Sequence, residues 1–162
     1  MEYQHITHPF PPICDHNSRI LILGTLPSAK SRENAFYYGH PRNRFWPLIA
    51  RLCDAPIPET IAEKTVLLLK NRIALWDVVY SCDIHGSSDS SIQNVTPTDL
   101  NRILDEAKIM HIFANGGKAA ALYQRYQQKQ TGIEITVLPS TSPANAAWNL
   151  DRLAQAWNII KE

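Results

Sequence analysis

Four short apolar runs, separated by helical patterns, constrain the fold of this chain more than any other feature. The runs cover Ile20–Leu23, Ile73–Val79, Ile109–Ala114 and Ile133–Leu138. Each has the composition and the length of a buried strand. Strands that alternate with helices are joined by right-handed crossovers and run parallel. The order of the elements therefore predicts an α/β fold with three layers, α/β/α, around a central, mainly parallel four-stranded sheet.

Five helical patterns occupy the remaining segments, namely Arg44–Cys53, Pro58–Lys70, Thr98–Ala107, Gly117–Gln128 and Ala144–Ile160. Pro58 suits a first helical turn, and Thr98 is expected to be the N-cap of its helix. Residues 1–19, which contain three prolines, are predicted to be irregular and to lie over the domain. The 162 residues show no repeat or linker and fit one domain of ordinary size, spanning 1–162.

The composition is that of a soluble globular protein, with 44% hydrophobic and 19% charged residues. No apolar run is long enough to span a membrane, and the first residues do not form a secretory leader. Three cysteines without a C-x-x-C pair indicate free thiols in a reducing compartment, so we expect a cytoplasmic protein. His5 and His8 are spaced like metal ligands, but no further Cys or His pair completes a tetrahedral set, so no metal is expected.

Polar or glycine-rich residues follow each of the four predicted strands. These segments are Gly24–Ser28, Asp77–Ser81, Asn115–Gly116 and Pro139–Asn145. Open α/β sheets bind their ligands at the carboxyl ends of the strands. Because the ends of parallel strands meet at one edge of a sheet, the four segments are predicted to share a cleft.

A crowded aromatic and polar segment follows the first of these strand ends. Between Phe36 and Asn43 lie two tyrosines, a histidine and an arginine. This combination beside a strand-end turn favours a pocket for a flat, hydrogen-bonding ligand. The net charge of +1 neither requires nor excludes nucleic acid, so a DNA-binding face would have to be local. Four nearby cations supply such a face, namely Lys30, Arg32, Arg42 and Arg44.

Four blocks of sequence carry a family resemblance. They are Gly24–Ser28, Tyr37–Trp46, Leu75–Val79 and Leu138–Asn145, and they extend over nearly the whole chain. With these blocks in this order, the chain resembles the uracil-DNA glycosylase superfamily. It is most similar to the branch that removes hypoxanthine from DNA, the DNA-deoxyinosine glycosylases. The ten residues of the second block are the most specific of the four.

The resemblance implies a monofunctional enzyme that flips a deaminated base, hypoxanthine above all, out of DNA and hydrolyses its glycosidic bond. The mismatch-specific uracil branch positions its attacking water with an asparagine where this chain has Leu26. In the hypoxanthine branch the catalytic asparagine lies in an H-P-x-N element, which here contains Asn43. The implied partner is damaged DNA, bound by a monomer without a cofactor. Two alternatives stay open: a uracil glycosylase of the same superfamily, and a non-catalytic nucleotide- or DNA-binding module.

Each residue with an implied role also has a plainer interpretation. Asn43 holds the attacking water or caps the helix that follows it, and an asparagine at this place can do both. Tyr38 stacks on the flipped base or is a core aromatic. The resemblance favours stacking, which is worth about 1–3 kcal/mol per base. His40 stabilises charge on the departing base or only hydrogen-bonds to the backbone and fixes its loop.

The resemblance also implies the other contacts of the cleft. The implied base-binding set is Gly24, Thr25, Leu26, Pro27, Ser28, Tyr38, His40 and Asn115. The amides of its first turn either bind the anionic leaving base or only form a tight turn. The corresponding loop of the family enters the minor groove and pinches the flanking phosphates, so the four cations are joined in the DNA-binding set by Ser140, Thr141, Ser142 and Asn145. Asp77 and Asp89 are interpreted as structural or loop-ordering acids, and residues 86–91 as an ordered loop near the cleft.

Overall fold

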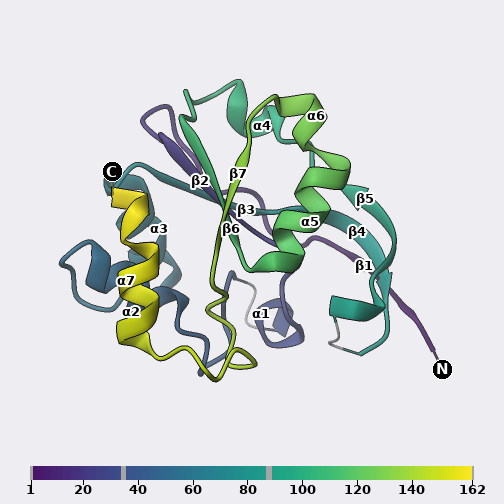
Figure 1. The fold of residues 1–162 in the computed structure, drawn as a ribbon, viewed down its shortest axis with the longest axis horizontal. Helices are drawn as coiled ribbons and strands as arrows, with labels where there is room; N and C mark the ends of the chain where they lie inside the picture. Colours follow the sequence, from purple (N-terminus) through teal and green to yellow (C-terminus); the bar gives the residue numbers. More distant parts are fainter. Residues whose placement is uncertain (1, 34–35, 87–88, 162) are drawn as a thin grey trace.

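The central sheet of the computed structural model has four parallel strands in the order β3-β2-β6-β7 (Figure 1). These are β2 (Ile20–Gly24), β3 (Ile73–Asp77), β6 (His111–Asn115) and β7 (Ile135–Leu138). The structure describes residues 2–33, 36–86 and 89–161. The register pairs Gly24 with Asp77, and Asn115 with Leu138, so that neighbouring strands end together. The predicted parallel four-stranded sheet is confirmed.

Helices cover both faces of this sheet. All five residues of β2 and of β3 are buried, which explains why both strands are apolar throughout rather than alternating. In Figure 1 one face carries α2 (Phe45–Leu52), α3 (Ile61–Lys70) and α7 (Leu150–Trp157), and the other carries α5 (Gly117–Tyr126). The predicted three-layer α/β/α arrangement is therefore confirmed as well.

A second sheet, antiparallel and three-stranded, has the order β1-β4-β5. Its strands are β1 (Gln4–Thr7), β4 (Val79–Ile84) and β5 (Gln93–Pro97). The chain leaves the first sheet at Val78, whose N–H donates to the Gly24 carbonyl at 2.8 Å. The run predicted as one strand, 73–79, therefore belongs to two strands in different sheets. The prediction of an irregular segment at 1–19 was wrong for β1, because only Ile6 of this strand is buried and so no apolar pattern marks it.

A capping box determines where α3 begins. Thr60 Oγ1 accepts from the Glu63 N–H at 3.0 Å, and Glu63 Oε1 accepts from the Thr60 N–H at 3.0 Å. These two bonds satisfy amides that the helix itself cannot pair. The helix consequently begins at Ile61 and not, as predicted, at Pro58.

Three other helices depart from their predicted bounds. The pattern at 98–107 yields only α4 (Asn101–Leu104), and Thr98 does not cap it, because its hydroxyl donates to the Asp77 carbonyl at 2.8 Å. The pattern at 117–128 yields α5 and then α6 (Gln128–Thr131). The pattern at 144–160 yields α7 and η2 (Asn158–Lys161), and Asn149 caps α7 by accepting from the Arg152 N–H at 2.9 Å. By contrast, α2 lies within one residue of its predicted bounds at each end.

The remaining elements are short. They are α1 (Ala29–Glu33) and η1 (Asp89–Ser91). Of the loop predicted at 86–91, residues 87–88 and the side chain of Asp89 lie outside the part of the chain that the structure describes. Cys14, Cys53 and Cys82 form no disulfide, as predicted. Within the described ranges, no helix has the length and apolar content needed to cross a bilayer.

Replacing Thr60 by alanine should lower the free energy of unfolding by about 1 kcal/mol, because the substitution removes the oxygen that accepts from the Glu63 amide. Equilibrium denaturation in urea measures the change. Thr65→Ala is the matched control, since Thr65 is half-buried in the same helix and its hydroxyl donates to the Ile61 carbonyl without capping anything. Thr65→Ala should change the free energy of unfolding little, because alanine is a better helix former than threonine. Equal losses in the two variants would contradict the capping argument.

Candidate functional site

A cavity of about 410 Å³ opens at the carboxyl ends of the parallel strands. Gly24 of β2, Asp77 of β3, Asn115 of β6 and Ser140 of the loop after β7 all line it. A volume of this size is typical of small-molecule sites. The cavity brings together most of the site residues expected from the sequence, namely Gly24, Thr25, Leu26, Pro27, Ser28, Arg32, Tyr38, Asn43, Asn115, Ser140, Thr141 and Ser142.

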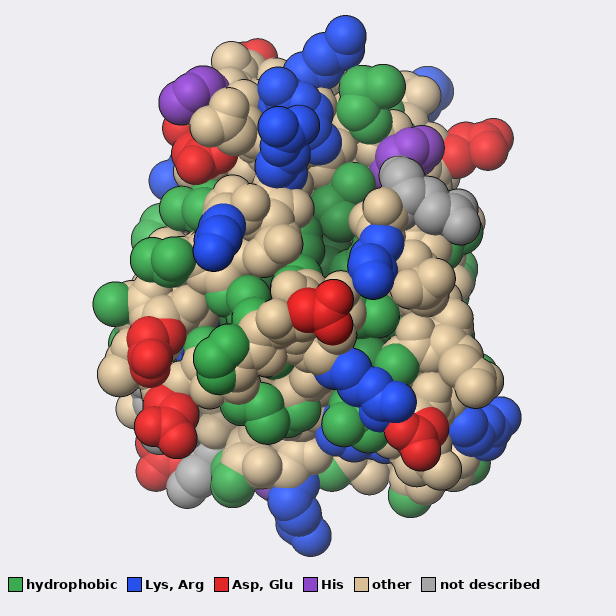
Figure 2. Space-filling model, turned by 90° about the vertical axis from the view of Figure 1, so that its left-hand side faces the viewer, with side chains coloured by type: hydrophobic (Ala, Val, Ile, Leu, Met, Phe, Trp, Pro, Cys, Tyr) green, Lys and Arg blue, Asp and Glu red, His purple; other side chains and the backbone are tan. Residues whose placement is uncertain are grey.

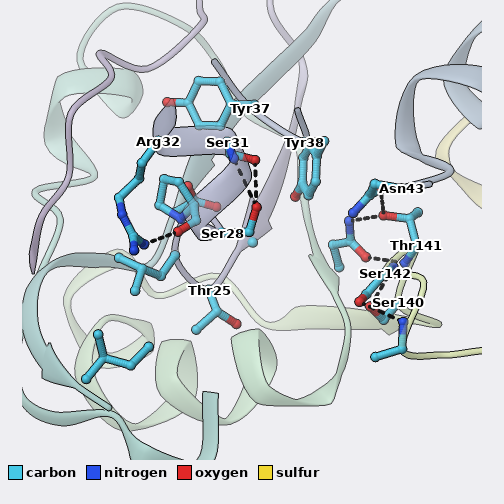
Figure 3. Close-up of a pocket in the computed structure, with 17 residues that line it drawn as sticks. Thr25, Ser28, Ser31, Arg32, Tyr37, Tyr38, Asn43, Ser140, Thr141 and Ser142 are labelled. Atoms are coloured by element: carbon cyan, nitrogen blue, oxygen red, sulfur yellow. Dashed lines mark hydrogen bonds between the residues drawn. The ribbon is translucent and has the colours of Figure 1, made fainter. Parts of the chain in front are cut away.

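Three side chains from distant parts of the chain are joined by hydrogen bonds on one wall of the cavity (Figure 3). Asn115 Nδ2 donates to Thr141 Oγ1 at 3.0 Å, and Thr141 Oγ1 donates in turn to Asn43 Oδ1 at 2.8 Å. The Thr141 N–H donates to Asn115 Oδ1 at 3.0 Å. Thr141 is fully buried, so its side chain fixes Asn43 relative to Asn115 instead of contacting DNA as expected.

Asn43 uses its oxygen for structure and leaves its nitrogen available. Besides the Thr141 hydroxyl, Oδ1 accepts from the Phe45 N–H at 2.9 Å, at the start of α2. This contact has the geometry of an Asx turn, which resembles the cap considered from the sequence. A carboxamide oxygen has two lone pairs, and both are engaged here. Nδ2 has no hydrogen-bond partner among the described residues, so it is the atom of Asn43 that is able to donate a hydrogen bond to a ligand.

Tyr38 presents a flat surface to the cavity. Its backbone is in the left-handed region, at φ 52°, and its ring stacks on Phe45 with 4.1 Å between ring centroids and 21° between planes. Because Phe45 covers one face, the opposite face is the one on which a flat ligand can stack. The hydroxyl oxygen is buried near the Asn115 side chain but makes no hydrogen bond of normal geometry in the described ranges. Burial above all, and then the charge of Asp77, raises the pKa of Tyr38, so this hydroxyl stays protonated at neutral pH.

The turn after β2 offers backbone donors to the cavity. Pro27 has no N–H, and the amides of Leu26 and Ser28 have no acceptor among the described residues. Ser28 Oγ accepts from the Ser31 N–H at 3.1 Å, which fixes the start of α1. Ser31 Oγ accepts from the Gly39 N–H at 2.9 Å. These bonds tie the turn to the segment that carries Tyr38.

Gly24 keeps the floor of the cavity open. A Cβ atom at this position would stand 2.4 Å from Asp77 Oδ1 and 2.7 Å from the Tyr38 hydroxyl oxygen. Both distances are too short for any side chain, so a substitution would displace one of the two polar groups. The close approach of these groups therefore requires glycine here.

Asp77 and His8 form a buried pair below this floor. Asp77 Oδ2 lies 2.8 Å from His8 Nε2, and the two side chains are only 4% and 1% exposed. His8 Nδ1 accepts from the Phe10 N–H at 3.2 Å, so Nε2 carries the proton and donates to Asp77. Asp77 Oδ1 has no hydrogen-bond partner among the described residues.

Arg44 holds the loop after β7 in place. Its Nη2 donates to the carbonyls of Ser142 at 2.7 Å and Asn145 at 3.2 Å, and its Nε donates to the Thr141 carbonyl at 3.3 Å. Asn145 Nδ2 donates to the Ser140 carbonyl at 3.0 Å. Both side chains were expected to contact DNA. The structure uses them within the protein instead, to shape this loop.

The other expected contacts have different surroundings. His40 lies outside the cavity lining, and its Nδ1 accepts from the Arg42 N–H at 3.1 Å, which matches the loop-fixing alternative and not a base contact. Arg42 is exposed, and Arg32 donates from Nη1 to the Pro27 carbonyl at 2.8 Å. The side chain of Lys30 lies outside the described part of the chain.

Of the remaining lining residues, Tyr37, Asp77 and Ala144 lie in segments that were predicted to form the pocket or the cleft but were given no base or DNA contact, and Ser31 and Ile84 were missed altogether. Ile84 belongs to the unpredicted second sheet, so no signal in its neighbourhood pointed to the cavity. Asp77 lies within the predicted run 73–79 and opens a predicted strand-end segment, and knowledge that β3 pairs with β2 would have placed it beside Gly24. Within the described ranges, no group of three or more His, Cys, Asp or Glu residues is placed to hold a metal ion.

Residues 11–161 match the family described as the Uracil DNA glycosylase superfamily. The chain belongs to this superfamily. It is 34% identical over 156 residues to a hypoxanthine DNA glycosylase of Methanosarcina acetivorans, covering 96% of this chain and 98% of that protein. A protein of the same name from Methanosarcina barkeri is 33% identical over 137 residues, which cover 84% of this chain and 86% of that protein. A solution NMR structure from Methanosarcina acetivorans, described provisionally as a uracil DNA glycosylase, matches with a TM-score of 0.82 and 33% identity over 98% of each chain. These similarities confirm the resemblance found in the sequence.

Arg44→Ala should increase amide hydrogen exchange in residues 140–145 of this superfamily member, because three carbonyls of the loop lose their guanidinium donor. Hydrogen-exchange mass spectrometry measures the change. Arg42→Ala is the matched control, since Arg42 is exposed and its guanidinium has no hydrogen-bond partner among the described residues. Protection of the loop should be the same in the control as in the wild type. An Arg44 variant with unchanged exchange would return Arg44 to the group of candidate phosphate contacts.

Proposed function

We propose that this protein is a monofunctional DNA glycosylase that flips hypoxanthine out of DNA and hydrolyses its N-glycosidic bond. The observation that carries the proposal is the available Nδ2 of Asn43, fixed at the wall of a cavity that Tyr38 also lines. Relatives named hypoxanthine DNA glycosylase support the choice of base. Leu26 supports it too, because its side chain cannot position a water where the mismatch-specific uracil branch uses asparagine.

Extrusion of the nucleotide is the first step. Flipping costs a few kcal/mol, and the cost is least where base pairing is already weak, as it is for a deaminated base opposite its old partner. The open face of the Tyr38 ring replaces part of the lost base stacking, a contact worth about 1–3 kcal/mol. Its other face rests on Phe45, so the platform is rigid before the base arrives.

Cleavage then separates a sugar cation from an anionic purine. Because the cation is largely formed before the water attacks, the water needs little activation and has only to be held near C1′. It accepts from Asn43 Nδ2 with one lone pair and attacks C1′ with the other, and its proton passes to solvent. The amides of Leu26 and Ser28 donate to the departing base and stabilise its charge. The product is an abasic site, and no cofactor takes part.

Contacts with phosphates are assigned to Lys30, Arg32 and Arg42 and, in the loop after β7, to Ser140 and Ser142. A net charge of +1 gives no strong global field, so DNA binding rests on a small local set of contacts. Figure 2 supports this view: acidic and basic side chains are mixed on the face of α2, α3 and α7, and the main group of Lys and Arg lies at its upper end. The carboxyl ends of β6 and β7 point downwards in Figure 1, away from that group. Within the loop, Ser140 and Ser142 accept N–H groups at 3.1 and 3.2 Å, so each hydroxyl remains able to donate to a phosphate.

A cleavage panel tests the proposed function. Duplex and single-stranded oligonucleotides containing hypoxanthine, uracil, xanthine or a thymine mismatch are incubated with the protein and then treated with alkali. The strand should break at hypoxanthine. Breakage at uracil alone, at every protein concentration, would assign the protein to the uracil branch instead. DNA binding without breakage of any strand would favour the non-catalytic module.

Asn43→Ala should lower the single-turnover excision rate by about 10²-fold or more, because it removes the donor that holds the water in the transition state. The substitution should also lower the free energy of unfolding by about 1 kcal/mol, the usual cost of a lost cap. Asn149→Ala is the matched control, since Asn149 caps α7 outside the cavity lining. Asn149→Ala should lower the free energy of unfolding by the same amount and leave the excision rate unchanged. Rates and melting curves are measured on the same samples, and similar rates in the two variants would reduce Asn43 to a cap.

Tyr38→Phe should retain the excision rate within about twofold, because the ring face stacks and the hydroxyl has no partner to lose in the free protein. Tyr38→Ala should reduce the rate by about tenfold to 100-fold, the loss expected for one stacking contact. Tyr80→Ala removes an exposed tyrosine outside the lining and serves as the control. If phenylalanine proved as damaging as alanine, the hydroxyl and not the ring face would be the functional part.

A further inference from the structure

The cavity floor carries a charge that the proposed mechanism does not use. His8 is neutral, because Nδ1 accepts from the Phe10 N–H and only Nε2 carries a proton. The carboxyl group of Asp77 thus pairs with a neutral histidine, which does not cancel the negative charge of a carboxylate at this place. A buried carboxylate is costly unless its oxygens are hydrogen-bonded. Only Oδ2 meets that condition among the described residues, which leaves Oδ1 in need of a donor.

The surroundings of Oδ1 direct it to a ligand. Asp77 belongs to the cavity lining, and its Oδ1 lies so close to Gly24 that a Cβ atom at that position would collide with it. A Cβ atom on Gly24 would also stand 2.7 Å from the Tyr38 hydroxyl oxygen. This hydroxyl is a second polar group without a partner in the described ranges. Two unpaired polar groups side by side in a buried pocket mark a place where a polar ligand edge completes their hydrogen bonds.

The depth of Asp77 indicates which edge of a base it meets. Its side chain is 4% exposed, whereas Asn43 is half-buried and bonded to the loop after β7. A flipped base remains attached to its sugar, so the edge farthest from the glycosidic bond enters first and reaches the floor. In a purine that distal edge is formed by N1 and the substituent at C6.

We propose that Asp77 selects the base, with Oδ1 accepting a hydrogen bond from a protonated ring nitrogen at its distal edge. This inference rests on the proposed glycosylase function and names its substrate class. Adenine has a lone pair at N1, which a carboxylate repels, and its donor on this edge is the neighbouring 6-amino group, so the discrimination requires that Oδ1 faces N1 itself. Deamination to hypoxanthine puts a proton on N1 and converts repulsion into a charge-assisted hydrogen bond. The same change occurs at N3 when cytosine becomes uracil, so Asp77 detects the deamination itself.

Binding to uncleavable substrates tests the assignment. Single strands carry a 2′-fluoroarabino nucleotide of either hypoxanthine or adenine, so that base pairing does not contribute, and fluorescence anisotropy gives each Kd. The wild type should bind the hypoxanthine strand roughly tenfold more tightly, in the range of one specific base contact. In Asp77→Asn the ratio should fall to about one, because the amide presents either an acceptor or a donor. A variant damaged only in structure would weaken both strands and keep the ratio.

Asp83→Asn is the matched control. Asp83 also contacts a histidine, His5, at 2.9 Å, but this pair belongs to the second sheet and lies outside the cavity lining. The control should keep the wild-type ratio. A wild-type ratio in Asp77→Asn as well would overturn the assignment of Asp77.

A second measurement needs no variant, which matters if Asp77→Asn does not fold. Free hypoxanthine should displace the hypoxanthine strand from the wild type at roughly tenfold lower concentration than free adenine or unsubstituted purine, neither of which has a protonated N1. Equal displacement by the three bases would overturn the proposal. Excision is assayed in parallel: a wild type that discriminates through Asp77 but never cleaves would refute the glycosylase function and leave the recognition role standing. Cleavage without Asp77-dependent discrimination would support the glycosylase function and refute the recognition role of Asp77.

Discussion

The hydrogen-bonded chain Asn115–Thr141–Asn43 is the constraint on which the site depends. Thr141 connects three segments that are far apart in sequence, and its carbonyl also accepts from the Arg44 N–H at 3.1 Å. These groups are buried or half-buried, where an unmade hydrogen bond costs about 1–3 kcal/mol. The end of β6, the loop after β7 and the start of α2 therefore keep their relative positions. The orientation of Asn43 thus follows from a threonine 98 positions away in the chain.

The sequence predicted the parts of the fold whose pattern is local. β2 and β3 are apolar throughout because both of their faces are covered, and α2 has one continuous apolar stripe. The second sheet escaped prediction because β1 buries one residue and β5 buries none, so neither has an apolar signature. The residues of the site follow the same rule, because those in one contiguous motif could be predicted and those brought in by strand pairing could not. Asn43 and Tyr38 stand in a contiguous motif, whereas Asp77 reaches the cavity only because β3 lies next to β2. Arg44 and Thr141 were expected to contact DNA because polar side chains beside a cleft suit either a ligand or the protein's own backbone, and only the geometry distinguishes the two.

A carboxylate at the floor has a consequence for the rate as well as for recognition. The departing purine gains negative charge, which Asp77 opposes, so in the proposed mechanism the amides of Leu26 and Ser28 must offset that repulsion. Binding a base and stabilising its departure are separate demands on a site, and only contacts that strengthen in the transition state accelerate the reaction. Under the proposed roles, Asp77 serves the first demand and the donors of the first turn serve the second. Specificity for a protonated ring nitrogen then comes with some loss of rate.

The position of Asn43 explains why the turn after β2 can contain a leucine. Leu26 packs against the hydrophobic core and has no polar atom in its side chain, so this position of the turn supplies no side chain that could hold a water. A loop residue before α2 can take over the water-holding role only if it is as rigid as a residue at a strand end. The Thr141 hydroxyl and the Phe45 N–H provide this rigidity by engaging both lone pairs of Oδ1. Because the oxygen is engaged, the proposed chemistry depends on the amide nitrogen, which positions a water but cannot remove its proton. Such a group suits a reaction in which the leaving base has largely departed before the water attacks.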